Sequence, residues 1–537
     1  MAYILAYDIG TTGVKTCLFE IVTGNATAES KIRMMADASA DYGLYTFDDG
    51  GAEQHADEWW DAMKISTRVL LEKTDVDIDG ISFCSQMQGL VLVDENGVPV
   101  RHPMSYMDQR AGAEMRSGIG GGLKIAGMNV HKLLKSLKIT GAVSGSVKDP
   151  MWKYLWVKTH EPENFKRVRW WLDVKEYLIS RMTGNFVMTR DSAFATLMFD
   201  SRDGKECWSS ELCRMFGVEE RHLPKIIKTH EQAGFLREQQ AGELGLKAGI
   251  PVFGGGGDAS LLGVGSGCTH TGDTHIYWGT SGWVSTITDK RVVDTNTMIA
   301  SIVGAQPGKF NYFAEMETAG KCLEWVKDHL AMDEIGIYLE KKDVTQNRNG
   351  VGKVYKTLYE YLTDVIDSAQ SGSGGVIFTP WLHGNRCPFE DPNAAGMFFN
   401  IRLETGKTEM IRAVVEGVCY HLRWMLECED KKVNTSETIR FCGGGALSPA
   451  TSQILADITG RRIETVPEPQ NAGSVGAAIT AAVGLGEAGS IEELSEMVKP
   501  DQVFEPRNEY RELHDRNFDT FKKLYVSNKK NYAALNG

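Results

Sequence analysis

The sequence lacks a long apolar segment. No stretch of its 537 residues reaches the roughly 18 consecutive apolar residues that cross a bilayer. The opening residues, MAYILAY, have neither the basic start nor the extended apolar core of a secretory signal. We therefore expect a cytoplasmic protein without a membrane partner.

Positive charge is also in deficit. The chain carries 58 Lys and Arg residues against 71 Asp and Glu residues, which gives a formal net charge of -13. Because such a surface repels polyanions, nucleic acids and anionic membranes are disfavoured as partners. A small neutral substrate fits the composition better.

Closely spaced cysteine pairs and two common nucleotide motifs are missing. The ten cysteines include no Cys-x-x-Cys pair, so we expect reduced thiols in the core and no cysteine metal site. The absence of Gly-x-x-x-x-Gly-Lys-[Ser/Thr] excludes a P-loop protein. No Gly-x-Gly-x-x-Gly opens a helix, which makes a Rossmann dehydrogenase improbable.

A glycine- and threonine-rich turn occurs twice. Residues 10–18 read GTTGVKTCL and residues 279–287 read GTSGWVSTI, about half a chain apart, and each follows a strand-like run. The match is either chance or the trace of a duplication that produced two similar domains, each opening with a β-hairpin. Turn glycines permit close backbone approach, and threonine hydroxyls and free N–H groups donate to phosphate oxygens. Two such hairpins facing across a cleft would hold one polyphosphate from both sides.

Strands alternate with helices along the rest of the chain, which predicts α/β layers. PMWKYLWVKTHEPENFKRV and DVKEYLISRMTG are expected to be amphipathic helices, the second ending at Gly184. A glycine-rich turn near residue 253 marks the expected boundary between a domain of residues 1–253 and one of residues 254–537. We expect a C-terminal amphipathic helix from about residue 505.

Asp8 ends the first strand, directly before the first turn. A carboxylate beside a phosphate-binding turn would repel the phosphate unless a divalent cation lay between them, so the pairing predicts Mg²⁺ at Asp8. The alternative is an ordinary aspartate that stabilises a turn.

Asp258 follows four glycines at a strand end and precedes a helix. This is the place where α/β proteins bind ligands. Its functional interpretation is a general base that accepts the proton of a substrate hydroxyl as that oxygen attacks phosphorus. The alternative is a helix N-cap.

Three other segments are candidates for ligand contact. Gly443, Gly444 and Gly445 precede a helix and would admit a flat purine, or they form a simple strand-to-helix turn. The SQMQG segment, residues 85–89, offers two carboxamides around a methionine, which suits a polyhydroxylated ligand. Asp108 and Arg110 form either a structural ion pair or part of a sugar wall. Trp59 and Trp60 are more readily explained as helix core than as a sugar platform.

Many segments, in order along nearly the whole chain, resemble the FGGY carbohydrate kinase family of the sugar kinase, heat-shock cognate and actin superfamily. They include YDIGTTGVK, GGAEQHADEWW, SQMQG, MDQR, EYLISRMTG, GGGGDAS, WGTSG, FTPWLHGNRCPFEDPNAAGMFFNI, RAVVEGVCYHLRWMLE, GGGALSPATSQILADITGRRI and NAGSVGAAITAAVGLG. The resemblance implies two ribonuclease H-like domains around a central cleft. It also implies ATP-dependent phosphorylation of a sugar hydroxyl.

The same resemblance assigns roles by position. Asp258 is the implied general base, and Asp8 is implied to help hold Mg²⁺. The implied ATP-binding residues are Thr11, Thr12, Lys15, Gly279, Thr280, Gly320, Gly444, Gly445 and Ser448. The implied sugar-binding residues are Gln86, Met87, Gln88, Asp108 and Asp258. Whether Lys15 contacts phosphate or only closes its hairpin stays open.

Within the family, the sugar element is most similar to that of xylulokinases, which carry Gln-Met-His-Gly where this chain has Gln86-Met87-Gln88-Gly89. The resemblance therefore implies a pentulose-like sugar as the substrate. Replacement of that histidine by Gln88 puts D-xylulose itself in doubt and leaves another ketose, a polyol or an aldonate as the alternatives. Glycerol is disfavoured, because glycerol kinases have an Asn-Gln-Arg-Glu type element here. A sensor without catalysis and a chaperone-like or actin-like ATPase are the competing classes, and a homodimer is left open.

Overall fold

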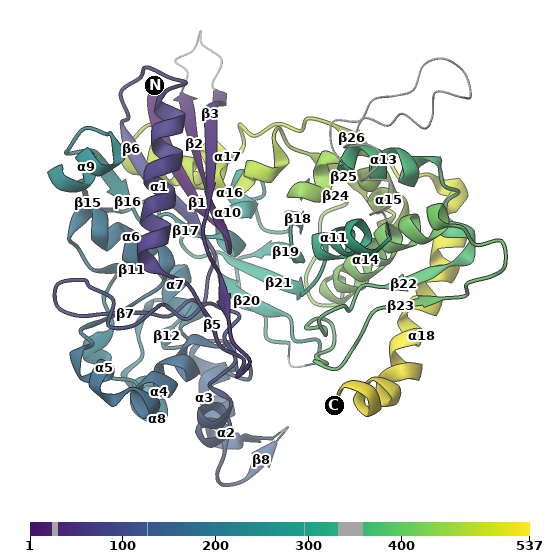
Figure 1. Cartoon of the computed structure of the whole chain (residues 1–537), viewed down its shortest axis with the longest axis horizontal. Helices are drawn as coiled ribbons and strands as arrows, with labels where there is room; N and C mark the ends of the chain where they lie inside the picture. Colours follow the sequence, from purple (N-terminus) through teal and green to yellow (C-terminus); the bar gives the residue numbers. More distant parts are fainter. Residues whose placement is uncertain (24–30, 126, 295, 331–357) are drawn as a thin grey trace.

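The computed structural model describes residues 1–23, 31–125, 127–294, 296–330 and 358–537. Two seven-stranded sheets form its two halves, and Figure 1 shows the purple-to-teal first half beside the teal-to-yellow second half. The first sheet contains β1 (Ala2–Ile9), β2 (Gly13–Val22), β3 (Lys31–Asp41), β6 (Gly80–Ser85), β15 (Gln232–Phe235), β16 (Pro251–Phe253) and β17 (Gly256–Gly257). The second contains β18 (Thr274–Trp278), β19 (Gly282–Thr288), β20 (Ala300–Val303), β21 (Phe310–Met316), β24 (Thr438–Cys442), β25 (Arg462–Thr465) and β26 (Val503–Phe504).

The two sheets share one topology. In the first, β1 pairs antiparallel with β2, β2 pairs antiparallel with β3, and β6 and β16 add in parallel on the other side of β1. In the second, β18, β19 and β21 form the antiparallel part, and β24 and β25 add in parallel beyond β18. The predicted α/β class with two related, ribonuclease H-like domains is confirmed.

The helices are grouped by chain order, and those that precede β18 are assigned to the first half. Those of the first half are α1 (Ala56–Leu71), α2 (Gly112–Ile119), α3 (Val130–Ile139), α4 (Pro150–His160), α5 (Pro162–Arg167), α6 (Val174–Thr183), α7 (Arg190–Ala195), α8 (Ser210–Phe216), α9 (Glu238–Leu244) and α10 (Asp258–Gly265). Those of the second half are α11 (Gly320–His329), α13 (Leu358–Ser368), α14 (Lys407–Asp430), α15 (Pro449–Thr459), α16 (Ala472–Leu485), α17 (Ile491–Ser495) and α18 (Arg511–Asn536). None in the described part of the chain has the length and apolarity needed to span a membrane.

Both faces of β1 are buried, because helices cover the first sheet on each side. Leu5, Tyr7 and Ile9 share a core cluster with α1, whereas Ile4 and Ala6 share another with α16. A strand covered on both faces reads as a nearly continuous apolar run, and YILAYDI does so. Tyr3 and Asp8 are half-buried, and the other positions of β1 are fully buried.

Two glycine-bearing helices cross where the halves meet. A side chain at Gly265 of α10 would collide with the Ala472 carbonyl of α16, and one at Gly476 would collide with the Leu261 carbonyl. Although α16 belongs to the second half, it packs against β1 and β6 of the first sheet. This close crossing fixes α10, whose first residue is Asp258, beside the carboxyl ends of β1 and β6.

Smaller elements surround the sheets. The short strands pair as β4 (Tyr45–Thr46) with β5 (Ala52–Glu53), β7 (Val91–Val93) with β10 (Trp170–Leu172), β8 (Lys124–Ile125) with β9 (Met128–Asn129), β11 (Val187–Thr189) with β14 (Lys225–Ile227), β12 (Phe199–Asp200) with β13 (Cys207–Trp208), and β22 (Ile377–Thr379) with β23 (Met397–Phe399). The 3₁₀ turns are η1 (Glu220–His222), η2 (Ser373–Gly375), η3 (Gly444–Leu447), η4 (Pro469–Asn471) and η5 (Asn508–Tyr510).

Several local expectations can be compared with these elements. The helix ending at Gly184 is confirmed, with Gly184 in the left-handed conformation at φ 79°. The single helix expected from Pro150 is instead α4 and α5, interrupted at Glu161 because the residue before Pro162 disfavours helical geometry. Helix α18 begins at Arg511 rather than near 505, after Pro506 and the η5 turn. The ten cysteines are free and nine are buried, and Trp59 and Trp60 lie in the core, as expected.

Candidate active site

The first phosphate turn, residues 10–12, joins β1 to β2 and has its carbonyl groups held from behind. Tyr42 donates its hydroxyl to the Gly10 carbonyl and its backbone N–H to the Thr12 carbonyl at 2.9 Å. The Gln54 amide donates to the Thr11 carbonyl at 2.7 Å. In a trans peptide the N–H points away from the preceding carbonyl. The N–H groups of Thr11 and Thr12 are therefore directed to the opposite side of the turn, where they are available to a phosphate.

The second turn, residues 279–281, is held in the same way by the start of α11. The backbone N–H of Gly320 donates to the Gly279 carbonyl at 2.8 Å, and that of Ala319 donates to the Thr280 carbonyl at 3.1 Å. A Cβ at Gly320 would lie 2.5 Å from the Gly279 carbonyl oxygen. The structure thus places Gly320 directly behind the second turn, where only glycine fits.

Asp8 lies opposite Lys15 in the first hairpin. Burial raises the pKa of Asp8, and the Lys15 charge and a hydrogen bond with Cys84 oppose that rise. The Lys15 ammonium donates to the Gln470 carbonyl at 3.0 Å and to the Asn471 side chain at 2.7 Å. Lys15 therefore ties the first hairpin to η4 and the start of α16, and its contact with phosphate stays a prediction.

Asp258 is the first residue of α10, and one of its carboxylate oxygens accepts the Ala259 N–H at 2.7 Å. Burial raises the pKa of Asp258 to about 7, with smaller contributions from the negative charges of Asp8 and Glu315. A carboxylate with this pKa holds a proton about half the time near neutral pH. It can therefore receive a proton from a hydroxyl and release it again.

Asp191 holds the turn that carries Asp258. This buried carboxylate accepts the Gly257 N–H at 2.7 Å and the hydroxyls of Ser260 and Thr189, each at 2.5 Å. The first turn of α10 is thereby attached to α7, so the position of the Asp258 backbone depends on Asp191.

The sugar element, residues 86–88, follows β6. The backbone N–H of Gln86 donates to the Ile9 carbonyl at 2.8 Å, which places Gln86 beside the end of β1. Met87 packs so closely on Gly257 that any side chain there would strike its sulfur. Gln88 adopts the left-handed conformation at φ 63°, which is uncommon for a residue other than glycine. The predicted sugar residues thus directly adjoin the turn of Asp258.

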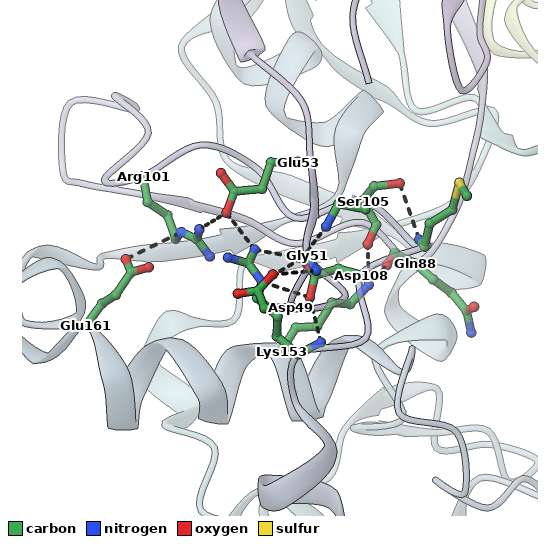
Figure 2. Close-up of polar contacts among 12 residues, drawn as sticks. Asp49, Gly51, Glu53, Gln88, Arg101, Ser105, Asp108, Lys153 and Glu161 are labelled. Atoms are coloured by element: carbon green, nitrogen blue, oxygen red, sulfur yellow. Dashed lines mark hydrogen bonds and ion pairs between the residues drawn. The ribbon is translucent and has the colours of Figure 1, made fainter. Parts of the chain in front are cut away.

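Lys153 of α4 joins the two loops that are predicted to line the sugar. Its ammonium donates to the Gln88 carbonyl at 2.7 Å and to the Ser105 carbonyl at 2.9 Å, as Figure 2 shows. Burial lowers the pKa of Lys153 to about 8, and the nearby carboxylates of Asp108 and Asp173 oppose the fall. Lys153 thereby attaches both loops to α4.

Asp108 is fully buried and its carboxylate is occupied by protein donors. It accepts the Ala52 N–H at 2.9 Å and pairs with the Arg110 guanidinium at 2.6 Å. Arg110 also pairs with Glu53 at 2.6 Å, and Glu53 pairs with Arg101 (Figure 2). The structural ion pair is thus present, whereas direct contact of Asp108 with a sugar stays a prediction.

The glycine turn after β24 divides into two parts. Side chains at Gly443 and Gly445 would collide with Trp278 of β18, so these glycines permit close packing. A Cβ at Gly444 would meet no atom within 4 Å, so this position faces open space. Ser448 caps α15 by accepting the Thr451 N–H at 3.2 Å. Gly444 and the start of α15 are the parts of this segment accessible to a nucleotide.

The carboxylates suit a magnesium ion that arrives with ATP. In the described residues no cluster of three His, Cys, Asp or Glu side chains forms a complete metal cage. Mg²⁺ in phosphate-transfer sites commonly uses one or two carboxylates together with phosphate oxygens and water. Asp8 fits that role, because a cation would offset the burial that now raises its pKa.

Sequence reasoning assigned no role to Gln54, Lys153 or Asp191. Lys153 lies in the aromatic segment WKYLW, and a lysine within an apolar helix face is a signal for a buried, paired cation. Gln54 lies in the GGAEQHADEWW motif and Asp191 lies in the first turn of α7, but their partners are distant in the chain. Those contacts come from the tertiary structure alone.

Curated relatives match the chain from end to end. It is 28% identical over 538 residues to the xylulose kinase of Staphylococcus epidermidis, with 99% of this chain and 98% of that protein covered. It is 28% identical to the gluconokinase of Bacillus licheniformis, with 95% and 94% covered.

Solved structures show the same fold. A ligand-bound xylulose kinase from Lactobacillus acidophilus superposes with a TM-score of 0.83 at 24% identity, covering 99% of this chain and 100% of that one. The glycerol kinase of Plasmodium falciparum with ADP superposes with a TM-score of 0.78 at 18% identity, covering 97% and 98%.

Family models account for most of the chain. The N-terminal domain of the FGGY family of carbohydrate kinases matches residues 3–265, and the C-terminal domain of that family matches residues 275–485. This chain therefore belongs to the FGGY family of carbohydrate kinases and is an enzyme that transfers a phosphoryl group to a sugar.

Proposed function

We propose that this carbohydrate kinase transfers the γ-phosphoryl group of ATP to a hydroxyl of a pentulose, with Asp258 as general base. The observation that carries the proposal is the contact between Met87 of the sugar element and Gly257, the residue before Asp258. A sugar bound at Met87 would lie next to a carboxylate whose pKa, about 7, suits proton transfer.

The proposed chemistry depends mainly on positioning. Phosphoryl transfer requires an in-line approach and neutralisation of the phosphate oxygens, and a base is needed only for the hydroxyl proton. The N–H groups of Thr11, Thr12 and Thr280 would contact ATP phosphates from the two turns. Asp8 would hold Mg²⁺, which when bound supplies positive charge to the phosphates.

The nucleotide would lie along the second half. Gly444 would admit the adenosine, and Ser448 would lie beside it. Gly320 would act through the Gly279 backbone and Gly445 through its packing on the Trp278 side chain. We assign the enzyme to the cytoplasm, where ATP is available and free cysteines such as these ten stay reduced.

We assign a pentulose as the substrate because the relatives include xylulose kinases. An aldonate is the second candidate. The gluconokinase of Bacillus licheniformis covers nearly the same span at the same identity of 28%. Gln88 also differs from the histidine of the xylulokinase-type element, and its amide can donate to a carboxylate as well as to a hydroxyl.

A coupled assay of ADP release tests the proposal. Pentuloses, other ketoses, polyols and aldonates are supplied with Mg-ATP to the wild type and to Asp258→Asn. We expect a pentulose to give the highest kcat/KM and Asp258→Asn to lower kcat by about 10²–10⁴-fold while ADP affinity persists. Preference for gluconate would move the substrate to the aldonates, and no response to any acceptor would contradict the proposal.

A further inference from the structure

Gln54 connects the sugar element to the first phosphate turn. Its side-chain nitrogen donates to the Thr11 carbonyl at 2.7 Å, and its side-chain oxygen accepts from the Gln86 amide at 3.1 Å. The Gln54 side chain is only 1% exposed, so these protein partners take the place of water.

Only one orientation of each amide satisfies this chain of contacts. The Thr11 carbonyl can only accept, so the Gln54 nitrogen must face it and the Gln54 oxygen must face Gln86. Gln86 must then direct its nitrogen to Gln54. The direction of the Gln86 amide is therefore determined by Thr11, two hydrogen bonds away.

The remaining atom of this chain is the Gln86 side-chain oxygen. It is buried and has no hydrogen-bond partner in the described part of the chain. A buried acceptor without a partner costs about 1–3 kcal/mol, which a ligand hydroxyl that donates to it would recover. Gln86 precedes Met87, which lies against the turn of Asp258, so this oxygen belongs to the region where the sugar is proposed to bind.

The backbone around Gln54 is fixed independently of any ligand. The Gln54 N–H donates to the Pro103 carbonyl at 3.0 Å, and the neighbouring Glu53 is held by Arg101 and Arg110 (Figure 2). The Gln86 N–H is bound to the Ile9 carbonyl. The two amides therefore meet in a rigid frame, and their polarity is preset before substrate arrives.

We infer that Gln54 is a positioning residue that fixes the Gln86 side-chain oxygen toward the substrate. In that orientation the oxygen accepts a hydrogen bond from a sugar hydroxyl. The Gln54 side chain also holds the Thr11 carbonyl and so orients the first phosphate turn. The first role rests on the proposed function, since it takes a sugar as the occupant. The second role needs only a nucleotide.

Two variants separate these roles. Gln54→Met keeps the length of the side chain and removes both hydrogen bonds. Gln54→Glu keeps the acceptor for Gln86 and loses the donor to Thr11. Gln86→Met serves as the matched control, because it removes the sugar contact and leaves Gln54 bound to Thr11.

Calorimetry measures the affinity for Mg-ADP, which tests the role of Gln54 at the first phosphate turn. We expect both Gln54 variants to weaken Mg-ADP binding by about fivefold, the equivalent of one hydrogen bond, and Gln86→Met to leave it unchanged. Equal Mg-ADP affinity in all four proteins would overturn the role of Gln54 at Thr11. This result does not depend on which sugar the enzyme accepts.

Kinetics with the best acceptor and its deoxy analogues measure the sugar contact. In the wild type, we expect one deoxy analogue to lose about tenfold or more in kcat/KM, because the Gln86 oxygen is left without a donor. Gln54→Glu should retain that discrimination, whereas Gln54→Met, whose Gln86 amide is free to turn over, should lose most of it. The double variant with Gln54→Met and Gln86→Met should lose less in kcat/KM than the product of the losses in the two single variants.

Failure of the inference and failure of the proposed function give different results. A wild type that phosphorylates none of the acceptors would contradict the proposed function, and the Mg-ADP measurement would still decide the role at Thr11. If the wild type is active and Gln54→Met still loses as much kcat/KM with the deoxy analogue as the wild type does, the role of Gln54 in orienting Gln86 would be overturned. If Gln54→Met does not fold, Gln54→Glu decides the Thr11 contact, and full deoxy discrimination in Gln86→Met would overturn the sugar contact.

Discussion

The two Gly-Thr hairpins have turns of equal length and differ in pairing register and in charge. Each has a three-residue turn between antiparallel strands, residues 10–12 in one and 279–281 in the other, with the turn carbonyls held from behind. Asp8 and Lys15 face each other in the first hairpin. The position that corresponds to Asp8 is Tyr277 in the second, and Tyr277 stacks on Trp283 at 4.0 Å between ring centroids.

This difference shows how two similar hairpins can have different roles at one site. The second hairpin offers backbone N–H groups and a hydroxyl, with an aromatic pair beneath. The first adds the charged groups and adjoins the sugar element through Ile9 and Gln86. We infer that both turns bind phosphate and that only the first organises the metal and the sugar.

Replacing Asp8, which is the acidic residue that only the first hairpin has at this position, should have the largest effect on kcat/KM. We expect Asp8→Asn to lower kcat/KM by about 100-fold or more, because the proposed Mg²⁺ ligand is removed. Tyr277→Phe should remain close to the wild type, since the ring stack is retained. Steady-state kinetics over a range of Mg²⁺ concentrations measure both, and an equal loss in Tyr277→Phe would contradict the division of tasks.

The decrease of kcat/KM at low pH tests Asp258, the proposed base at the start of α10. The pKa of Asp258 is about 7, and the proposed base must be ionised, so kcat/KM should fall about tenfold per pH unit below pH 7. Asp191→Asn should shift the pH of this decrease, because it alters the support of the Asp258 turn. A profile that is flat from pH 5 to pH 8 would argue against Asp258 as the base.

The same pKa predicts a change in stability. In the unfolded chain an aspartate titrates at about 3.9, well below the folded value of about 7, so folding favours the protonated form. This contribution is present below pH 4 and is lost as the pH rises through 7. Asp258→Asn should therefore raise Tm relative to the wild type at pH 8 and have little effect at pH 4. Thermal unfolding at both pH values measures this, and a Tm difference that is the same at pH 4 and pH 8 would contradict it.

Adding one methyl group at Gly320 tests whether its close packing on the second turn is needed. We expect Gly320→Ala to raise KM for ATP by about tenfold, because its Cβ would lie 2.5 Å from the Gly279 oxygen and displace the turn. Gly242→Ala, where the added Cβ meets no atom within 4 Å, is the control. No change in KM for ATP would mean that the second turn tolerates displacement.

Lys15 should have the smallest effect. Its ammonium is already bound to Gln470 and Asn471, so Lys15→Met should change KM for ATP by no more than about fivefold and lower Tm slightly. The corresponding residue of the second hairpin is the apolar Val284. A loss in kcat as large as that of Asp8→Asn would show that Lys15 contacts the transferred phosphate.

The fold was predictable from the sequence where local patterns repeat. The Gly-Thr turns and their flanking strands indicated two related α/β domains, and the ordered motifs indicated the kinase family. Helix breaks were less predictable, as at Glu161, where a proline overrides an amphipathic pattern.

The site was predictable only in its short motifs. The contacts of Gln54 with Thr11 and Gln86, and of Lys153 with Gln88, join residues more than 30 positions apart. No periodicity or turn signal encodes such contacts, because they depend on how separate loops pack around β1 and β6. The ion pair of Asp108 with Arg110 was one of the two interpretations of the sequence, but the contacts of this pair with Ala52 and Glu53 come from the tertiary structure.

Product analysis by ³¹P NMR tests the central claim most directly. The wild type and Asp258→Asn are each incubated with Mg-ATP and a pentulose, and the fate of the γ-phosphorus is followed. We predict a new sugar phosphomonoester signal and ADP with the wild type, and formation of both at least about 100-fold more slowly with Asp258→Asn. Inorganic phosphate as the only product, or an undiminished phosphomonoester signal with Asp258→Asn, would contradict the account.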